Sequence, residues 1–96
     1  MRRDIRECVE EYFNENNITD LMNYGSSRDE GFSDISDVVA DCLVKVGYLV
    51  EYNYSEEISD GKYEISVGCL DRGFRYDLYA WDGVDDVVEI IEDILE

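Results

Sequence analysis

Residues 82–96, DGVDDVVEIIEDILE, constrain the fold more than any other stretch of the chain. At a helical step of about 100° per residue, the apolar and acidic side chains separate onto two arcs. The apolar arc holds Val84, Val87, Val88, Ile90, Ile91, Ile94 and Leu95. The opposite arc holds Asp85, Asp86, Glu89, Glu92, Asp93 and Glu96, with no Lys or Arg among them. The segment predicts a helix whose back must be covered by the rest of the chain and whose front is anionic.

Two earlier segments, residues 2–16 and 34–46, also have helical spacing. Their apolar residues recur three or four positions apart: Ile5, Cys8, Val9, Tyr12 and Phe13 in the first, and Ile35, Val38, Val39, Cys42, Leu43 and Val46 in the second. Ser33 or Asp34 is the expected N-cap of the second helix, and Gly47 is its expected end. Between the two helices, residues 23–33 are turn-rich.

From Tyr48 onward the period changes to two, which is typical of strands. We expect strands near residues 48–54, 62–69 and 74–81, joined by turns at 55–61 and 71–73. In the first strand, Tyr48, Val50, Tyr52 and Tyr54 alternate with Leu49, Glu51 and Asn53. We group Asn53 with Tyr79 and Trp81 on the face of the sheet that points away from the helices.

The expected order of elements is therefore α-α-β-β-β-α. This pattern predicts an α+β fold, with a three-stranded antiparallel sheet covered by helices on one face. With 96 residues, the chain has the length of one domain of modest core, so we expect residues 1–96 to form a single acidic domain.

The charge of the chain is strongly unbalanced. Asp and Glu number 25, Lys and Arg number 8, and His is absent, which gives a formal net charge of -17. Such a charge repels itself in the folded state and disfavours direct binding to nucleic acid or to an anionic membrane. It reflects either an acidic or halophilic proteome, or a surface built to meet a basic protein.

We expect Arg2, Arg3 and Arg6 to pair with nearby carboxylates at little net energy.

The residue types disfavour catalysis and predict no cofactor or metal. Without His, neither a Ser-His nor a Cys-His nucleophile can form. The stretch 82–93 lacks the glycine that an EF-hand needs at its sixth position, and Cys8, Cys42 and Cys69 lack zinc-site spacing. An odd number of cysteines, with no signal peptide and no long apolar run, favours a reducing cytoplasm.

The candidate partner-binding residues are the carboxylates of the last predicted helix. Residues four apart on a helix lie about 6 Å apart along its axis. Asp85, Glu89 and Asp93 therefore form one acidic row, and Asp82 with Asp86 starts another. These separations are comparable with those of neighbouring phosphates on a nucleic-acid strand, so a basic nucleic-acid-binding protein would find an alternative ligand here.

Two further groups of residues are second candidates for partner contact. One is the acidic region Asp29, Glu30, Asp34 and Asp37. The other is the aromatic pair Tyr79 and Trp81, because aromatic residues among charges are frequent interface anchors. The alternative for Trp81 is that it tucks under the last helix.

With its short antiparallel sheet, flanking helices and acidic rows such as DDVVEIIED, the chain resembles the small acidic phage-encoded nucleic-acid mimics, including several anti-CRISPR proteins. The resemblance is one of architecture and charge. It implies a protein that acts in the cytoplasm of a host bacterial cell. There it would occupy the PAM-reading or guide/target channel of a CRISPR effector, or block another bacterial defence enzyme.

Two other functions fit the same surface. An immunity protein would neutralise the basic active site of a nuclease toxin, with Tyr79 and Trp81 as central contacts. A noninhibitory acidic regulatory subunit would carry its charge for solubility alone.

Overall fold

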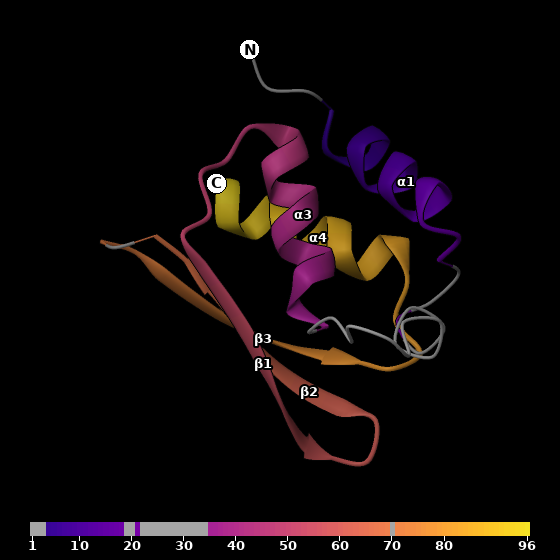
Figure 1. Ribbon diagram of the computed structural model, residues 1–96, viewed down its shortest axis with the longest axis vertical. Coiled ribbons are helices and arrows are strands. Elements are labelled where there is room, and N and C mark those ends of the chain that lie inside the picture. The colour runs from indigo at the N-terminus through magenta and orange to yellow at the C-terminus, as the bar shows by residue number, and fades with distance from the viewer. Residues whose placement is uncertain (1–3, 19–20, 22–34, 70) are drawn as a thin grey trace.

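The computed structural model describes residues 4–18, 21, 35–69 and 71–96. In this part of the chain the elements follow the predicted order α-α-β-β-β-α (Figure 1). They are α1 (Ile5–Glu15), α3 (Ser36–Val46), β1 (Tyr52–Ser59), β2 (Lys62–Gly68), β3 (Gly73–Tyr79) and α4 (Val84–Leu95). The predicted α+β fold class is confirmed.

Several helix ends are closed by residues that satisfy backbone groups. At the start of α1, the Asp4 carboxylate accepts a hydrogen bond from the Glu7 amide at 2.9 Å. At the start of α4, the Asp86 carboxylate reaches back to the Gly83 amide at 3.1 Å. The predicted end of α3 at Gly47 is confirmed, with a left-handed φ of 110° that suits glycine. The prediction of Ser33 or Asp34 as the N-cap of α3 was wrong, because the helix begins at Ser36 and its N-cap is Ile35, which has no side-chain capping hydrogen bond. Ser33 and Asp34 themselves lie outside the described residues.

The sheet has the strand order β1-β2-β3, and both neighbouring pairs are antiparallel. The prediction for the first strand was wrong in its bounds, because β1 starts at Tyr52 and continues through residues 55–59, where the sequence pattern predicts a turn. The physical reason is the tight turn at Asp60-Gly61, where Ser59 pairs with Lys62 and Gly61 has a φ of 77°. A two-residue hairpin loop requires both strands to extend right up to it.

The predicted faces of the first strand were also wrong. Asn53 lies opposite Val67, on the side of the sheet that carries the core, whereas Tyr54 lies opposite Ser66 on the other side. Asn53 tolerates this position because its amide nitrogen donates to Ser36 Oγ at 2.8 Å and to Asp37 Oδ1 at 2.7 Å. Tyr54 is 53% exposed as a result.

The helices lie together on one side of the sheet (Figure 1). Helix α3 contacts β1 and β2, α4 contacts β3, and α1 packs on α3 and α4. The apolar back of α4 enters the core as predicted, with Val87, Val88, Ile90, Ile91 and Ile94 buried. This packing holds α4 in a fixed orientation, so its opposite arc faces solvent.

Candidate partner-binding surface

The solvent-facing side of α4 carries six carboxylates, all on exposed residues. We call this set the acidic face: Asp85, Asp86, Glu89, Glu92, Asp93 and Glu96. The helix axis is fixed by the buried back of α4, so the carboxylates are held on a preorganised scaffold rather than on a loop.

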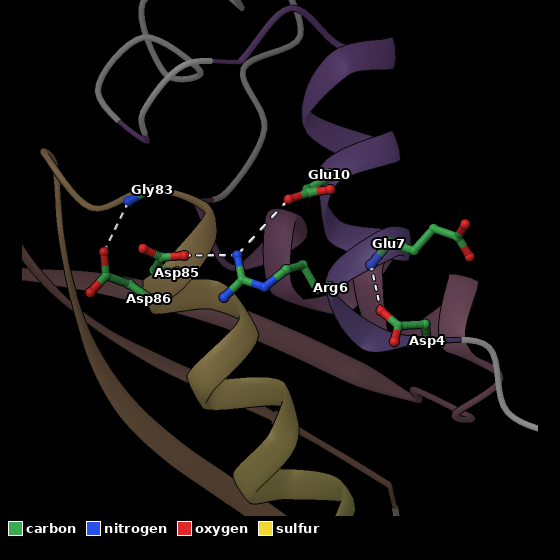
Figure 2. Close-up of polar contacts among 7 residues, drawn as sticks. All are labelled: Asp4, Arg6, Glu7, Glu10, Gly83, Asp85 and Asp86. Atoms are coloured by element: carbon green, nitrogen blue, oxygen red, sulfur yellow. Dashed lines mark hydrogen bonds and ion pairs between the residues drawn. The ribbon is translucent and has the colours of Figure 1, made fainter.

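Within the part of the chain that the structure describes, the fold brings a cation to this face from a helix far away in the sequence. Arg6 of α1 places its Nη1 atom 2.8 Å from Asp85 Oδ1 and 3.9 Å from Glu10 Oε2 (Figure 2). The hydrogen bond to Asp85 is the main cause of the raised pKa of Arg6. The expectation that Arg6 pairs with a carboxylate is confirmed, while Arg2 and Arg3 lie outside the described residues. Asp85 is therefore partly neutralised, and the N-terminal end of the acidic face is less negative than its sequence indicates.

Two other members of the acidic face have partners inside the protein. Asp86 closes the first turn of α4 through the Gly83 amide (Figure 2). Asp93 accepts a hydrogen bond from the Tyr76 hydroxyl of β3. Burial, followed by this hydrogen bond, raises the pKa of Tyr76 well above its ordinary value. Both carboxylates thus help to hold α4 in place as well as to present charge.

The remaining three carboxylates make no direct polar contact with the described residues, although Glu92 lies close enough to Arg6 to contribute to its raised pKa. Glu89, Glu92 and Glu96 form no hydrogen bond or ion pair with the described residues. They lie three or four residues apart on the middle and C-terminal turns of α4, so they are neighbours on the helix surface. The most available negative charge lies in this half of the acidic face.

The aromatic candidates Tyr79 and Trp81 stack on each other, with ring centroids 5.1 Å apart and planes inclined by 29°. Trp81 is 63% exposed, so it is not tucked under α4. Its ring lies against the Gly61 backbone, where a Cβ would approach within 3.0 Å of the indole. Lys62 Nζ lies 5.7 Å from the centre of the Tyr79 ring.

A groove between β3 and α4 joins the aromatic pair to the acidic face. We call it the aromatic groove; it has a volume of about 410 Å³. Its lining residues are Asp77, Leu78, Tyr79, Trp81, Asp82, Asp86, Glu89 and Ile90. A second groove of about 410 Å³ continues from it along α4, and Glu89 and Ile90 line both. The structure therefore brings the predicted carboxylates and the predicted aromatics into one surface.

Asp82 lies between β3 and α4 and lines the aromatic groove. Its carboxylate accepts a hydrogen bond from the Tyr79 amide at 2.8 Å. Burial is the main cause of the raised pKa of Asp82, and the nearby Asp86 raises it further. Asp82 thus shapes the turn that presents Trp81.

The second acidic region is not brought to this surface by any described contact. Asp29, Glu30 and Asp34 lie outside the described residues. Asp37 is described, and its carboxylate accepts the hydrogen bond from Asn53 at the contact between α3 and β1. Asp37 therefore has a structural partner in the fold.

Two residues that complete the surface were not predicted as part of it. Arg6 meets Asp85 across 79 positions of the chain, and Tyr76 meets Asp93 across 17. Tyr76 belonged to the expected core face of its strand, and its ring does pack against the core while its hydroxyl reaches the acidic face. No pattern within a single segment carries either contact.

A group of metal-ligating side chains or a reactive thiol would be another kind of site among the described residues. No group of three or more metal-ligating side chains gathers among them. Cys8 and Cys42 are buried free thiols, and burial raises the pKa of Cys42 to about 12, which keeps it protonated. No described helix has both the length and the apolar character needed to cross a bilayer.

Comparison of the chain with protein-family models, with curated proteins and with solved structures finds no match in any of the three.

Proposed function

We propose that this protein is a noncatalytic inhibitor that competes with nucleic acid for a basic site on a nucleic-acid-binding protein. The observation that carries the proposal is the row of exposed carboxylates Glu89, Glu92 and Glu96, which form no hydrogen bond or ion pair with the described residues, on a helix whose back is fixed in the core. Following the resemblance to phage-encoded mimics, the first partner to test is a CRISPR effector, and the next is another bacterial defence enzyme in the same cytoplasm.

The physical basis is competition for the same Lys and Arg side chains. A basic channel that binds nucleic acid is arranged to neutralise a row of phosphates. Carboxylates on a rigid helix can meet the same cations, and they lose less conformational freedom on binding than a flexible strand does. A net charge of -17 also accelerates encounter with a positively charged partner.

The test begins with capture of partners from bacterial lysates that contain CRISPR effectors. Washes at about 0.15 M and then about 0.5 M salt separate diffuse charge attraction from a fitted interface. A purified partner is then loaded with labelled nucleic acid, and the protein is added in increasing amounts. The proposal expects stoichiometric release of the nucleic acid.

Matched charge variants make the test specific. Glu89→Gln with Glu92→Gln removes two charges from the acidic face, whereas Glu51→Gln with Glu56→Gln removes two exposed charges at β1. Only the first pair is expected to weaken the release of nucleic acid. The proposal is wrong if no nucleic acid is released by the wild type, or if both pairs weaken the release equally.

The second candidate function is that of an immunity protein for a nuclease toxin. It is favoured by the exposed Trp81 stacked on Tyr79, because Trp and Tyr dominate the binding energy of many tight interfaces. In that case Trp81→Ala alone would abolish binding. For a nucleic-acid mimic, the loss from Trp81→Ala would be smaller than that from the paired changes at Glu89 and Glu92. An acidic regulatory subunit, the third possibility, would have no tight basic partner.

A further inference from the structure

The aromatic groove combines two kinds of group that attract the same type of ligand. One wall is the stacked pair Tyr79 and Trp81, and four carboxylates share the lining: Asp77, Asp82, Asp86 and Glu89. The faces of aromatic rings carry negative charge density and attract cations, as carboxylates do. The eight lining residues include no Lys or Arg. The groove therefore has the composition of a site for a positively charged group.

The chain itself already places a cation at the edge of this groove. Lys62 Nζ lies 3.7 Å from Asp77 Oδ2 and 5.7 Å from the centre of the Tyr79 ring. This contact shows that a cation can satisfy a carboxylate and an aromatic ring of this groove together. Lys62 lies over the Tyr79 ring, and Trp81 remains 63% exposed.

We infer that the aromatic groove receives an arginine side chain of the basic partner, with its guanidinium stacked on Trp81 and hydrogen-bonded to a groove carboxylate. Arginine fits better than lysine because its planar guanidinium stacks on aromatic rings and donates two parallel hydrogen bonds to one carboxylate. The guanidinium is also more weakly hydrated than an ammonium group, so it loses less on entering the groove. The inference rests on the proposed function, because it takes the partner to be basic and names the side chain that this surface selects.

A second copy of this chain is a poor occupant of the groove. Each copy carries a net charge of -17, so two copies repel each other.

A single Trp in the sequence, Trp81, makes the groove directly observable by fluorescence. Binding of a peptide can therefore be followed at the proposed site without a label on the protein.

The experiment compares hexa-arginine with hexa-lysine, two peptides of equal charge, titrated at about 0.15 M salt, where long-range attraction is screened. Trp81 emission reports binding to the wild type, and anisotropy of labelled peptides reports binding to the variants. Hexa-arginine is expected to bind about fivefold more tightly than hexa-lysine, as a partly exposed cation–π contact would give. Trp81→Leu should remove this preference, and Tyr54→Leu, at an exposed tyrosine outside the groove, should leave it intact.

Each result separates this inference from the proposed function. The arginine site is overturned if the two peptides bind equally and Trp81→Leu does not change their binding. If Glu89→Gln with Glu92→Gln weakens that binding, the acidic face remains as the binding surface. Failure of both peptides to bind also overturns it. An arginine preference that depends on Trp81 supports the site even if the protein releases no nucleic acid from any partner, in which case the proposed function alone is wrong.

Discussion

Replacement of Glu89 by Gln is expected to stabilise the protein while weakening its binding to a basic partner. Glu89 lies in the middle of α4, four residues from Asp85 and Asp93 and three from Asp86 and Glu92. Like charges at these spacings each destabilise a helix by roughly 0.2–0.5 kcal/mol. Four such pairs amount to roughly 0.8–2 kcal/mol, and the lower half of this range is expected because Arg6 already offsets the charge of Asp85.

The free energy of unfolding of Glu89→Gln should therefore exceed that of the wild type by about 1 kcal/mol at low ionic strength. Urea denaturation measures this difference directly, and a rise in Tm of about 4–8 °C would accompany it. The gain should shrink toward zero as salt is raised to about 1 M, where the screening length is about 3 Å.

Glu15→Gln is the matched control, because it also removes one negative charge from an exposed helix position. Glu15 lies 3.4 Å from Lys45 Nζ, so its loss breaks an ion pair and relieves no such cluster. It should leave stability unchanged or lower it by up to about 1 kcal/mol. If Glu89→Gln is no more stable than Glu15→Gln at low salt, or if its gain persists at high salt, the carboxylates of α4 do not repel one another as the geometry implies.

Three further predictions test the sheet and the turn beside the groove. Asn53→Leu should cost roughly 1–3 kcal/mol in urea denaturation, because it removes a hydrogen bond to a carboxylate at the core face, whereas a solvent-facing Asn53 would give no loss. Gly73→Ala should destabilise by about 1 kcal/mol or less, because its Cβ would meet the hydroxyl of Tyr52, an exposed side chain that can move aside. The loss should be smaller in a Tyr52→Phe background, and equal losses would contradict the contact. Because the pKa of Asp82 is raised in the fold, the stability that its protonated form confers is lost as pH rises through that pKa. Asp82→Asn should therefore be more stable than the wild type at pH 7, and the difference in the free energy of unfolding should vanish below the ordinary Asp pKa of 3.8. A difference that does not depend on pH would refute the raised pKa of Asp82.

Much of the fold follows from local periodicity. The apolar spacing in α1, α3 and α4 predicted helices whose observed bounds differ by only a few residues from those expected. The turn at Asp60-Gly61 and the alternation after Lys62 likewise predicted a hairpin. These features are determined by residues close together in the chain, and local propensity is strong where the hydrophobic pattern agrees with it.

The first strand shows where this reasoning stops. Tyr52 and Tyr54 alternate with Asn53, and hydrophobicity alone assigns the tyrosines to the core. The structure reverses this assignment, because Asn53 finds two hydrogen-bond partners on α3 and the ring of Tyr52 lies over a pair of glycines on the open face. A pattern of period two gives the alternation but not which face is inward; the register against β2 decides that.

The acidic arc of α4 was determined by the sequence alone, since the spacing of its carboxylates depends only on helix geometry. The tertiary structure decided how much of this negative charge faces solvent. Arg6 forms an ion pair with Asp85, and the Tyr76 hydroxyl donates a hydrogen bond to Asp93. Glu89 lines the aromatic groove together with Tyr79 and Trp81. These contacts join residues that are far apart in the chain. Whether they form depends on how α1 and β3 pack against α4, which no single stretch of sequence specifies.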